Sequence, residues 1–452
     1  LLSVLLAVIF STSQQDYTLV YCTLPAGVNS LDYYAFSGCK ALTGVSVPAS
    51  LSVINQMAFS NTTSLTSFTI PYSCTSIGSN VFESSSVQEI KMNKKLQSIG
   101  SAAFKSSGLK RFKAQSSITS MGKVTDVWSK PENKFLSDVF ENCLDLVEID
   151  FSEQTSFLGQ IFQGCVSLST AILPNRLTEI PEGQFRNCSS LAGVSYKNGD
   201  QIVNKFPSTL KTIGRYAFYY CAFTDLLLDD CSKVLIGEYS FAGNNFSNLI
   251  VPTPQIAEVM SYAFSSSDNL LTIEWKIENQ VPEYCFAYSK KLKSFTATSI
   301  KNGIEDCAFI DCSSLNSVTL TLAGSNFFIL SSVFKNCAIS EIVIPNGVVT
   351  IGSQAFYGNP FKNLVFPDTL TKLAEDALQN CQNLEKFELT NDLSEIISNL
   401  NKIGSTPKWY IEGEPYLVGT DRSSAPDGIG PKAVYTTIPG KASQVDWEWI
   451  EV

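Results

Sequence analysis

The stretch Phe36–Pro48, FSGCKALTGVSVP, is one copy of a unit from which most of this chain is built. It holds a phenylalanine, a cysteine three residues later, a leucine three residues after that, and an alternating apolar run that ends in proline. The same spacing returns at Phe140/Cys143/Leu146, Phe162/Cys165/Leu168, Phe185/Cys188/Leu191 and Phe309/Cys312/Leu315. A motif that recurs in this way predicts a repeat architecture.

The repeat has a nearly constant period. Successive key aromatics are 22 to 25 residues apart, except for steps of 36 (Phe104 to Phe140) and 33 (Phe185 to Phe218). The positions are Phe36, Phe59, Phe82, Phe104, Phe140, Phe162, Phe185, Phe218, Phe241, Phe264, Phe286, Phe309, Phe334 and Phe356, with Leu378 in the same role. We therefore expect about 15 coils of 22–23 residues over residues 22–389, with insertions near 114–133 and 197–206.

Each copy contains two extended pieces. Leu65–Pro71, LTSFTIP, alternates apolar and polar side chains as a half-buried strand does, and Pro71 ends it because proline has no N–H to donate to a ladder. A second piece such as Leu96–Gly100, LQSIG, precedes the phenylalanine, and its glycine supplies a corner. One such coil cannot bury its apolar edges alone. The sequence predicts a β-rich solenoid of stacked coils with a concave parallel sheet.

The residues between the inward-facing apolar positions of each strand face outward, and stacking arranges them in two columns. Charge concentrates in three successive copies of these columns, at Glu89, Lys91, Arg111, Lys113, Glu148 and Asp150. The cations belong to a basic block that also holds Lys94, Lys95, Lys105 and Lys110. A charge step beside an inserted loop predicts a partner-binding site, and the alternative is an ordinary solvated strand face. The columns also predict single exposed apolar residues: Ile172, Leu227, Ile250, Val343 and Val365.

The composition excludes several functions. The net charge is −10, whereas nucleic-acid binding needs a basic footprint. The chain has no histidine, which removes imidazole bases and every histidine-ligated metal site. Acidic pairs such as Asp229/Asp230 are common on solvated strands, and no phosphate-binding loop accompanies them. We expect no enzyme activity, no cofactor and no metal.

Of the 13 cysteines, eight follow a repeat aromatic by three residues: Cys39, Cys143, Cys165, Cys188, Cys221, Cys312, Cys337 and Cys381. Stacking brings consecutive members about 5 Å apart, a separation that permits a disulfide without requiring one. Other copies carry Thr, Ser or Asn at this position, which favours a buried ladder of free thiols. Cys285 and Cys307 lie off the ladder and are candidates for pairing across coils.

The chain begins with an apolar run of ten residues, Leu1–Phe10, which is interrupted only by Ser3 and is followed by small polar residues. Residues 1–13 are interpreted as part of a secretory signal peptide, and the alternative is a buried first strand. No later run is long enough to span a membrane. Three glycosylation sequons begin at Asn61, Asn187 and Asn245. Secretion is the expectation.

After Leu389 the repeat stops. Residues 392–403 have the apolar spacing of an amphipathic helix. Beyond it, short strands are expected at 408–410, 416–418, 433–438 and 445–450, in a segment with three of the five tryptophans. Residues 390–452 form either a C-terminal cap or a small Trp-rich β module.

The repeat L-x-x-V-x-I-P…L-x-x-I-G-x-x-A-F-x-x-C resembles the leucine-rich repeat of BspA-like surface proteins, the Treponema pallidum type. The resemblance covers residues 24 to about 389 and recurs as AFSGC at 35–39, AFYYC at 217–221 and AFIDC at 308–312. Bacterial proteins and large families of parasitic protists, notably trichomonads, share this repeat, and the resemblance implies an origin in such a protist. It also implies a secreted or cell-surface protein that binds host proteins or other cells. Many protist relatives add a C-terminal membrane span, for which no segment of this chain is long enough.

The sequence thus predicts an extracellular adhesion protein that docks host or matrix proteins, or cell-surface glycans, on its solenoid face. Attachment to the cell surface would be non-covalent. Two alternatives stay open: a carbohydrate-binding or hydrolytic module in the C-terminal tail, and a purely structural coat component.

Overall fold

The structure, a computed structural model, describes residues 17–123, 139–157, 162–374 and 376–384, and the backbone of strands at 386–389, 433–437 and 445–449. The chain divides into two compact units, Leu1–Val234 and Leu235–Val452. The expected signal peptide at 1–13 and the expected helix at 392–403 lie outside the described residues.

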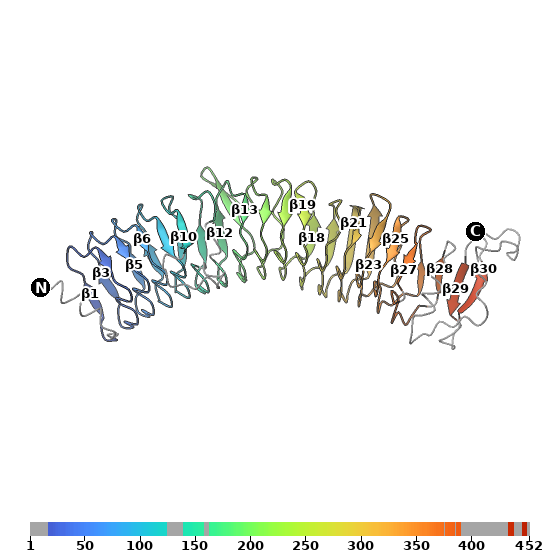
Figure 1. Cartoon of the computed structure of the whole chain (residues 1–452), viewed down its shortest axis with the longest axis horizontal. Helices are drawn as coiled ribbons and strands as arrows, with labels where there is room; N and C mark the ends of the chain where they lie inside the picture. The colour runs from blue at the N-terminus through green and yellow to red at the C-terminus, as the bar shows by residue number, and fades with distance from the viewer. Residues whose placement is uncertain are drawn as a thin grey trace. The chain divides into compact units, whose positions relative to one another are not determined.

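The chain is a parallel-sheet β-solenoid of about 14 turns, close to the 15 expected. A coil contains a first strand, a second strand of two to four residues, and a turn segment that holds the repeat phenylalanine. No helix occurs in the ranges that the structure describes. Within each unit, the coils follow one another in chain order, and the short strands of successive coils lie side by side (Figure 1).

In the first unit, the first strands of successive coils form one face, called here the strand face. They are β1 (Tyr21–Thr23), β3 (Gly44–Ser46), β5 (Ser67–Thr69), β7 (Glu89–Lys91), β9 (Arg111–Lys113), β11 (Glu148–Asp150), β12 (Thr170–Leu173) and β14 (Ser195–Asn198). Paired neighbours among these strands are parallel and in register, for example Phe68 with Ile90 and Ile149 with Ala171. Side chains alternate between core and solvent, as the two-residue period requires.

The second strands of the first unit stack in the same way on another side of the coil. They are β2 (Ser30–Leu31), β4 (Val53–Ile54), β6 (Ser76–Ile77), β8 (Ser98–Gly100), β10 (Ser120–Lys123), β13 (Glu179–Ile180) and β16 (Thr212–Ile213). The corner after the second strand needs glycine where the backbones of neighbouring coils are in contact, because a side chain there would clash with the preceding coil. A Cβ added at Gly100 would lie 2.4 Å from the backbone nitrogen of Ser79.

Strand β10 bears on the position of the first insertion, which is expected near 114–133. Residues 114–123 follow the ordinary coil, and β10 pairs with β8 through Ser120 and Met121. The part of the expected range after Lys123 lies outside the described residues. Despite the insertion, β9 and β11 pair in register, Arg111 opposite Glu148 and Lys113 opposite Asp150.

The second insertion is a β-hairpin rather than a loop. Strand β15 (Gln201–Val203) folds back on β14 in antiparallel pairing, with Tyr196 opposite Val203 and Asn198 opposite Gln201. The turn between them contains Gly199, whose φ of 61° suits a tight hairpin turn. Residues 224–228 of the next coil form no strand, so β15 is the last strand of this sheet in the first unit.

Strand β17 (Val234–Ile236) begins at the last residue of the first unit. In the second unit the strand face consists of β18 (Asn248–Val251), β20 (Thr272–Trp275), β21 (Ser294–Ile300), β23 (Ser317–Leu322), β26 (Asn363–Val365) and β28 (Lys386–Leu389). The second strands are β19 (Ile256–Val259), β22 (Gly303–Ile304), β24 (Phe327–Ile329), β25 (Val348–Ile351) and β27 (Lys372–Leu373). β18, β20, β21 and β23 form one parallel sheet, and β26 joins a second with β28.

Two strands of the C-terminal tail continue this second sheet. β29 (Ala433–Thr437) pairs antiparallel with β28, and β30 (Val445–Trp449) pairs antiparallel with β29. They coincide with two of the four short strands expected in the tail, and the other two lie outside the described residues. Antiparallel strands at the end of a parallel stack cover an edge that would otherwise be open.

The repeat phenylalanines form a continuous stack through the core of each unit. In the first unit, neighbouring rings from Phe36 to Phe218 have centroids 5.2 to 5.6 Å apart. In the second unit, the rings from Phe241 to Phe356 are 5.3 to 5.9 Å apart. These rings are nearly parallel and buried. The constant period of the sequence is the period of this stack.

The turn around each phenylalanine uses left-handed backbone at two positions, two residues before and two residues after the ring. Non-glycine residues occupy most of them, such as Tyr34 (φ 62°), Asn61 (58°) and Ala102 (53°). A left-handed φ costs a non-glycine residue roughly 1–2 kcal/mol. Hydrogen bonds between coils offset that cost, as when the N–H groups of Tyr34 and Phe36 donate to Gln56 and Ala58.

Candidate functional site

The six residues expected to bind a partner lie on three successive strands of the first unit. Glu89 and Lys91 are on β7, Arg111 and Lys113 on β9, and Glu148 and Asp150 on β11. The alternation of each strand places the first four side chains in solvent, and Glu148 is half-buried. Five of the six are therefore accessible on one strand face. Asp150 differs, because only 8% of it is exposed.

Ion pairs connect most of these charges to one another. The Nε atom of Arg111 lies 3.3 Å from a carboxylate oxygen of Glu148, its register partner. Lys91 and Glu89, on the same strand, are 3.9 Å apart. Both pairs are exposed, and Arg111 has 79% of its side chain in solvent. Exposed pairs of this kind contribute about 0–1 kcal/mol each, so they can be exchanged for other partners.

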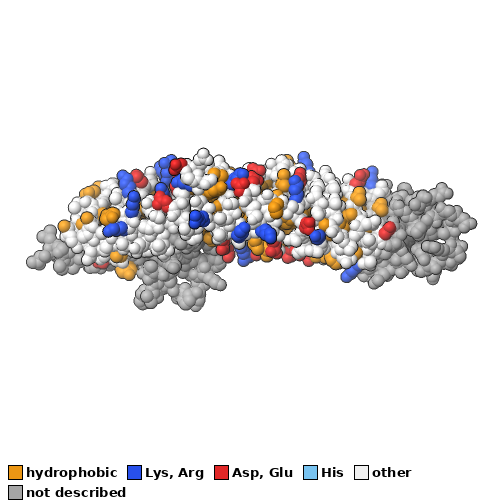
Figure 2. Space-filling model, turned by 90° about the horizontal axis from the view of Figure 1, so that it is seen from above, with side chains coloured by type: hydrophobic (Ala, Val, Ile, Leu, Met, Phe, Trp, Pro, Cys, Tyr) orange, Lys and Arg blue, Asp and Glu red, His pale blue; other side chains and the backbone are white. Residues whose placement is uncertain are grey.

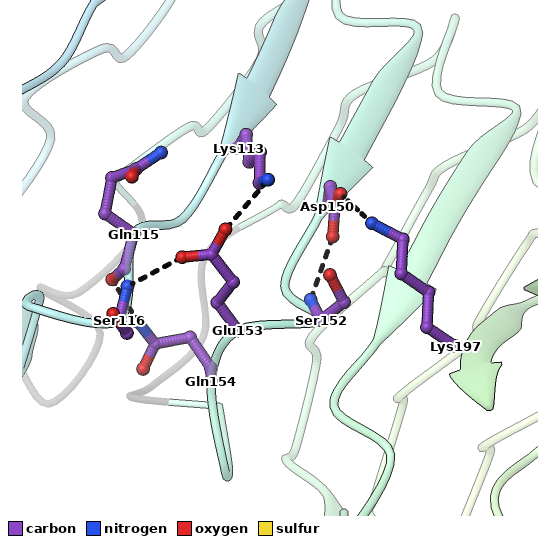
Figure 3. Close-up of polar contacts among 8 residues, drawn as sticks. All are labelled: Lys113, Gln115, Ser116, Asp150, Ser152, Glu153, Gln154 and Lys197. Atoms are coloured by element: carbon purple, nitrogen blue, oxygen red, sulfur yellow. Dashed lines mark hydrogen bonds and ion pairs between the residues drawn. The ribbon is translucent and has the colours of Figure 1, made fainter. Parts of the chain in front are cut away.

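A polar cluster lies at the ends of β9 and β11, where the chain leaves the strand face (Figure 3). The Nζ atom of Lys113 is 2.8 Å from Glu153. The second carboxylate oxygen of Glu153 accepts a hydrogen bond from the backbone N–H of Ser116, and Gln154 donates to the carbonyl of Gln115 at 2.6 Å. The segment after β11 is thereby fastened to the segment after β9.

Asp150 is held by the inserted hairpin. Lys197, on β14, places its Nζ atom 2.8 Å from one carboxylate oxygen, and the N–H of Ser152 donates to the other at 2.9 Å (Figure 3). Burial raises the pKa of Asp150, but the hydrogen bonds from Lys197 and Ser152 outweigh it and hold the pKa below its ordinary value. Asp150 is therefore an anchor for the hairpin rather than an outward-facing ligand.

Lys113 and Glu153 each stabilise the charged form of the other. The hydrogen bond from Lys113 lowers the pKa of Glu153, and the hydrogen bond to Glu153 raises the pKa of Lys113. Both groups are therefore charged at neutral pH. The carboxylate of Glu153 therefore neutralises the charge of Lys113, and this end of the strand face has no excess positive charge from that lysine.

The basic block is interrupted by acidic partners. Lys105 forms an ion pair with Glu141 at 2.7 Å, and Lys95 lies over the ring of Tyr72 at 4.5 Å. On the face drawn in Figure 2, Lys and Arg side chains are interspersed with Asp and Glu. The sequence showed a cluster of cations because several neutralising carboxylates come from other coils, distant along the chain.

The expectation of exposed apolar residues holds for Ile250, Val343 and Val365, with exposed fractions of 47%, 82% and 46%. It is wrong for Ile172, which is 4% exposed. It also fails for Leu227, which is half-buried and lies outside any strand with a φ of 55°. Both departures lie beside the hairpin, which changes the surroundings of the neighbouring coils.

All 13 cysteines are free thiols, and 12 of them are buried. Those on the turn ladder donate to the carbonyl of the preceding coil's phenylalanine, as Cys165 does to Phe140 at 3.1 Å and Cys312 does to Phe286 at 3.2 Å. The hydroxyls of Thr62, Ser85 and Ser267 at this position donate instead to the carbonyl of their own coil's phenylalanine. Burial raises the pKa of Cys312 to about 12, so the thiolate form is suppressed.

The suggested pairing of Cys285 with Cys307 is wrong. Cys285 takes the small inward position before Phe286 and is fully buried. Cys307 takes the outward position two residues before Phe309, and its hydrogen bond with Tyr284 raises the pKa of that tyrosine to about 12. Both cysteines are free thiols.

The three sequons all lie in turn segments. Asn61 and Asn245 are exposed, and Asn187 is half-buried. Across the described ranges, no group of three or more Cys, Asp or Glu side chains could hold a metal ion. The same ranges contain no helix with the length and apolarity needed to cross a bilayer.

Sequence reasoning missed a group of arginines and tyrosines in the first unit. Arg186 lies over the rings of Tyr216 and Tyr219, and Arg215 lies over Tyr216. Tyr220 is 46% exposed and packs against Tyr219 at 4.6 Å. The signal was present in the run RYAFYY at 215–220, where the repeat ordinarily has small or polar residues.

The chain matches the family described as BspA type leucine rich repeat region (6 copies), over residues 10–125, 133–206, 195–316 and 327–403. These ranges cover most of its length, so the chain belongs to this family. None of the curated proteins matches it.

Three solved structures are similar to this chain. A leucine-rich repeat protein from Bacteroides ovatus has a TM-score of 0.51 and 20% identity, covering 83% of this chain and 79% of that one. A leucine rich cell surface protein from Faecalibacterium prausnitzii has a TM-score of 0.38 and 20% identity, covering 85% and 90%. The pneumococcal vaccine antigen PcpA has a TM-score of 0.44 and 15% identity, covering 67% and 74%. The Bacteroides ovatus structure supports the fold. None of the three supports a protist source.

Proposed function

We propose that this protein is an extracellular binding protein that docks a host or matrix protein on the strand face of its first unit. The observation that carries the proposal is the exposed row of charges on β7, β9 and β11. Glu89, Lys91 and Arg111 have 64%, 68% and 79% of their side chains in solvent. Family membership supports a surface location and a binding role. The proposal includes non-covalent attachment to the cell surface.

The energetics of the row favour exchange with a partner. Its outer ion pairs contribute little to stability, so a partner can replace them without unfolding the coil. The backbone beneath them is fixed by register pairing and by the buried rings of Phe112 and Phe140. The Asp150–Lys197 contact additionally holds the hairpin at one end of the row. A rigid base with exchangeable charges suits recognition of a protein with a mixed-charge surface.

The first experiment measures attachment of beads coated with the full chain to cultured epithelial cells and to immobilised matrix proteins. We expect the variant Lys91→Glu/Arg111→Glu/Lys113→Glu to lose most of the attachment. The matched control is Lys290→Glu/Lys291→Glu/Lys293→Glu, which reverses three exposed lysines of the second unit and should keep it. Equal attachment by both variants, with unchanged circular dichroism, would contradict the proposal.

We further propose that Asn61, Asn187 and Asn245 carry N-glycans when the protein is secreted from a eukaryotic cell. Asn61 and Asn245 present their side chains to solvent at the surface of a turn. A mass decrease on treatment with an N-glycosidase, mapped to these peptides, is the expected result. Peptides of unmodified mass from the secreted protein would contradict it.

A further inference from the structure

Arg186 is a cation with an unusual environment in this chain. Its guanidinium carbon lies 5.2 Å from the ring centre of Tyr216 and 5.5 Å from that of Tyr219. Its Nε atom is buried and has no hydrogen-bond partner. In the part of the chain that the structure describes, no carboxylate forms an ion pair with it, whereas Lys105, Arg111, Lys113, Lys197 and Lys205 each have one.

An arginine keeps its charge at any physiological pH, because its pKa is above about 12. A half-buried guanidinium without an anion loses hydration and gains only the attraction of the ring faces. Its planar fork of N–H groups matches a carboxylate in a bidentate pair, which is stronger than a neutral hydrogen bond. An oxyanion would therefore supply the charge partner that Arg186 lacks among the described residues.

Tyr220 adds a second element. It lies in the next coil, 46% exposed, with its ring 4.6 Å from that of Tyr219 and perpendicular to it. An exposed tyrosine offers an apolar ring and a hydroxyl, and the ring of Tyr219 contacts both this tyrosine and the cation. A sugar ring that bears a carboxylate uses both features at once. An acidic peptide side chain would satisfy Arg186 and leave Tyr220 without a role.

We propose that Arg186, Tyr219 and Tyr220 form a binding site for an acidic monosaccharide unit, with the carboxylate on Arg186 and the sugar ring against Tyr220. The site lies on the turn segment of the first unit, so it does not depend on docking at the strand face. Asn187 follows Arg186 directly and is half-buried. A glycan on Asn187 would therefore be attached one residue from the proposed site.

The test uses the full chain produced in a bacterium, which attaches no N-glycan, with glucuronate as the probe. Saturation-transfer NMR and calorimetry should show binding with a Kd of about 1 mM, weakening as salt is added. Glucose and acetate should each bind at least about tenfold more weakly, because each lacks one of the two contacts. No binding of glucuronate by the native chain overturns the proposal, and so does acetate binding as tightly as glucuronate.

Variants separate recognition from a structural role of the arginine. Arg186→Gln should abolish glucuronate binding, Arg186→Lys should weaken it, and Tyr220→Ala should weaken glucuronate without changing the response to acetate. Lys335→Gln is the matched control, because Lys335 lies over Tyr357 at 4.8 Å but already donates to Gln354 at 2.6 Å. A folded Arg186→Gln or Tyr220→Ala variant that binds like the native chain overturns the proposal. N-acetylglutamate binding more tightly than glucuronate also overturns it, in favour of an acidic peptide.

Discussion

The strand faces of the two units have the same scaffold and different surface chemistry. In the first unit, β7, β9 and β11 carry glutamates, lysines, an arginine and an aspartate. In the second unit, the outward positions of β18, β20, β21 and β23 carry mainly Asn, Ser and Thr: Asn248, Thr272, Ser294, Thr296, Ser317 and Thr319. The phenylalanine stacks beneath the two faces have nearly the same spacing. Core and surface therefore vary independently in this fold, and recognition depends on the surface alone.

The largest expected effect is the loss of unfolding free energy when a ring is removed from the phenylalanine stack. It should be the same in both units, because both have this core. Phe162→Ala and Phe309→Ala each remove a fully buried ring from the stack and should each cost about 3–5 kcal/mol of unfolding free energy. The loss should remain mostly within the mutated unit, since solenoid contacts are between neighbouring coils. Amide hydrogen exchange, resolved by peptide, measures this. Uniform loss of protection over both units would contradict nearest-neighbour stability.

The next largest effect is a stability cost that should differ between the strand faces of the two units. Asp150→Ala leaves Lys197 without its partner in a partly buried place and should cost about 2 kcal/mol, less than for a fully buried pair. Thr296→Ala changes the corresponding outward position of β21 and should cost less than about 0.5 kcal/mol. Urea unfolding followed by exchange of the hairpin and of β21 measures both. Equal costs would show that the hairpin contact has no special role.

A third pair compares buried amides. Gln184 is fully buried and neither atom of its amide has a hydrogen-bond partner. Gln184→Met removes that unpaired group at similar volume and should stabilise the first unit by about 1–2 kcal/mol. Asn359, buried in the second unit, donates to the carbonyls of Phe334 and Phe356 and accepts from the N–H of Ile339. Asn359→Leu should therefore destabilise by about 1–3 kcal/mol. Thermal unfolding of each variant gives the sign, and destabilisation by Gln184→Met would refute the first half.

The periodic part of this structure could be predicted from the sequence because one side-chain pattern determines it. The spacing of Phe36 and its counterparts specified the stack, and the coil positions of the cysteines indicated their buried thiol ladder. The hairpin could not be predicted, because its anchor joins Asp150 to Lys197 across two coils. The charge block was misjudged for the same reason: Glu141 and Glu153 are far from Lys105 and Lys113 in sequence and adjacent in space. The local sequence pattern predicts the structure of each coil. The charge pairing on the surface depends on contacts between coils, whose sequences differ, and the local pattern does not contain them.

Acid should weaken the first unit more than the second. The pKa values of Asp150 and Glu153 are lowered in the folded chain, so their contribution is complete above their unfolded pKa values, near 4. That contribution is lost as the pH falls from about 4 through the lower, folded values, because protonation breaks the contacts with Lys197 and Lys113. Hydrogen exchange of residues 195–203, corrected for the intrinsic pH dependence, should increase below pH ~4 before exchange of β21 does. The reverse order would contradict this assignment.

The smallest effect bears most directly on the proposed function. A double-mutant cycle on Arg111 and Glu148 should give a coupling energy of about 0.3–1 kcal/mol, because 79% of the Arg111 side chain and 39% of the Glu148 side chain are in solvent. The coupling should decrease in 1 M salt, where the Debye length is about 3 Å, because the Arg111 side chain is mostly in solvent. A cycle on Ser294 and Ser317, register partners in the second unit, supplies the uncharged comparison and should give less. A coupling of several kcal/mol would mean that the Arg111–Glu148 pair is structural, and that the strand face of the first unit is closed to exchange with a partner.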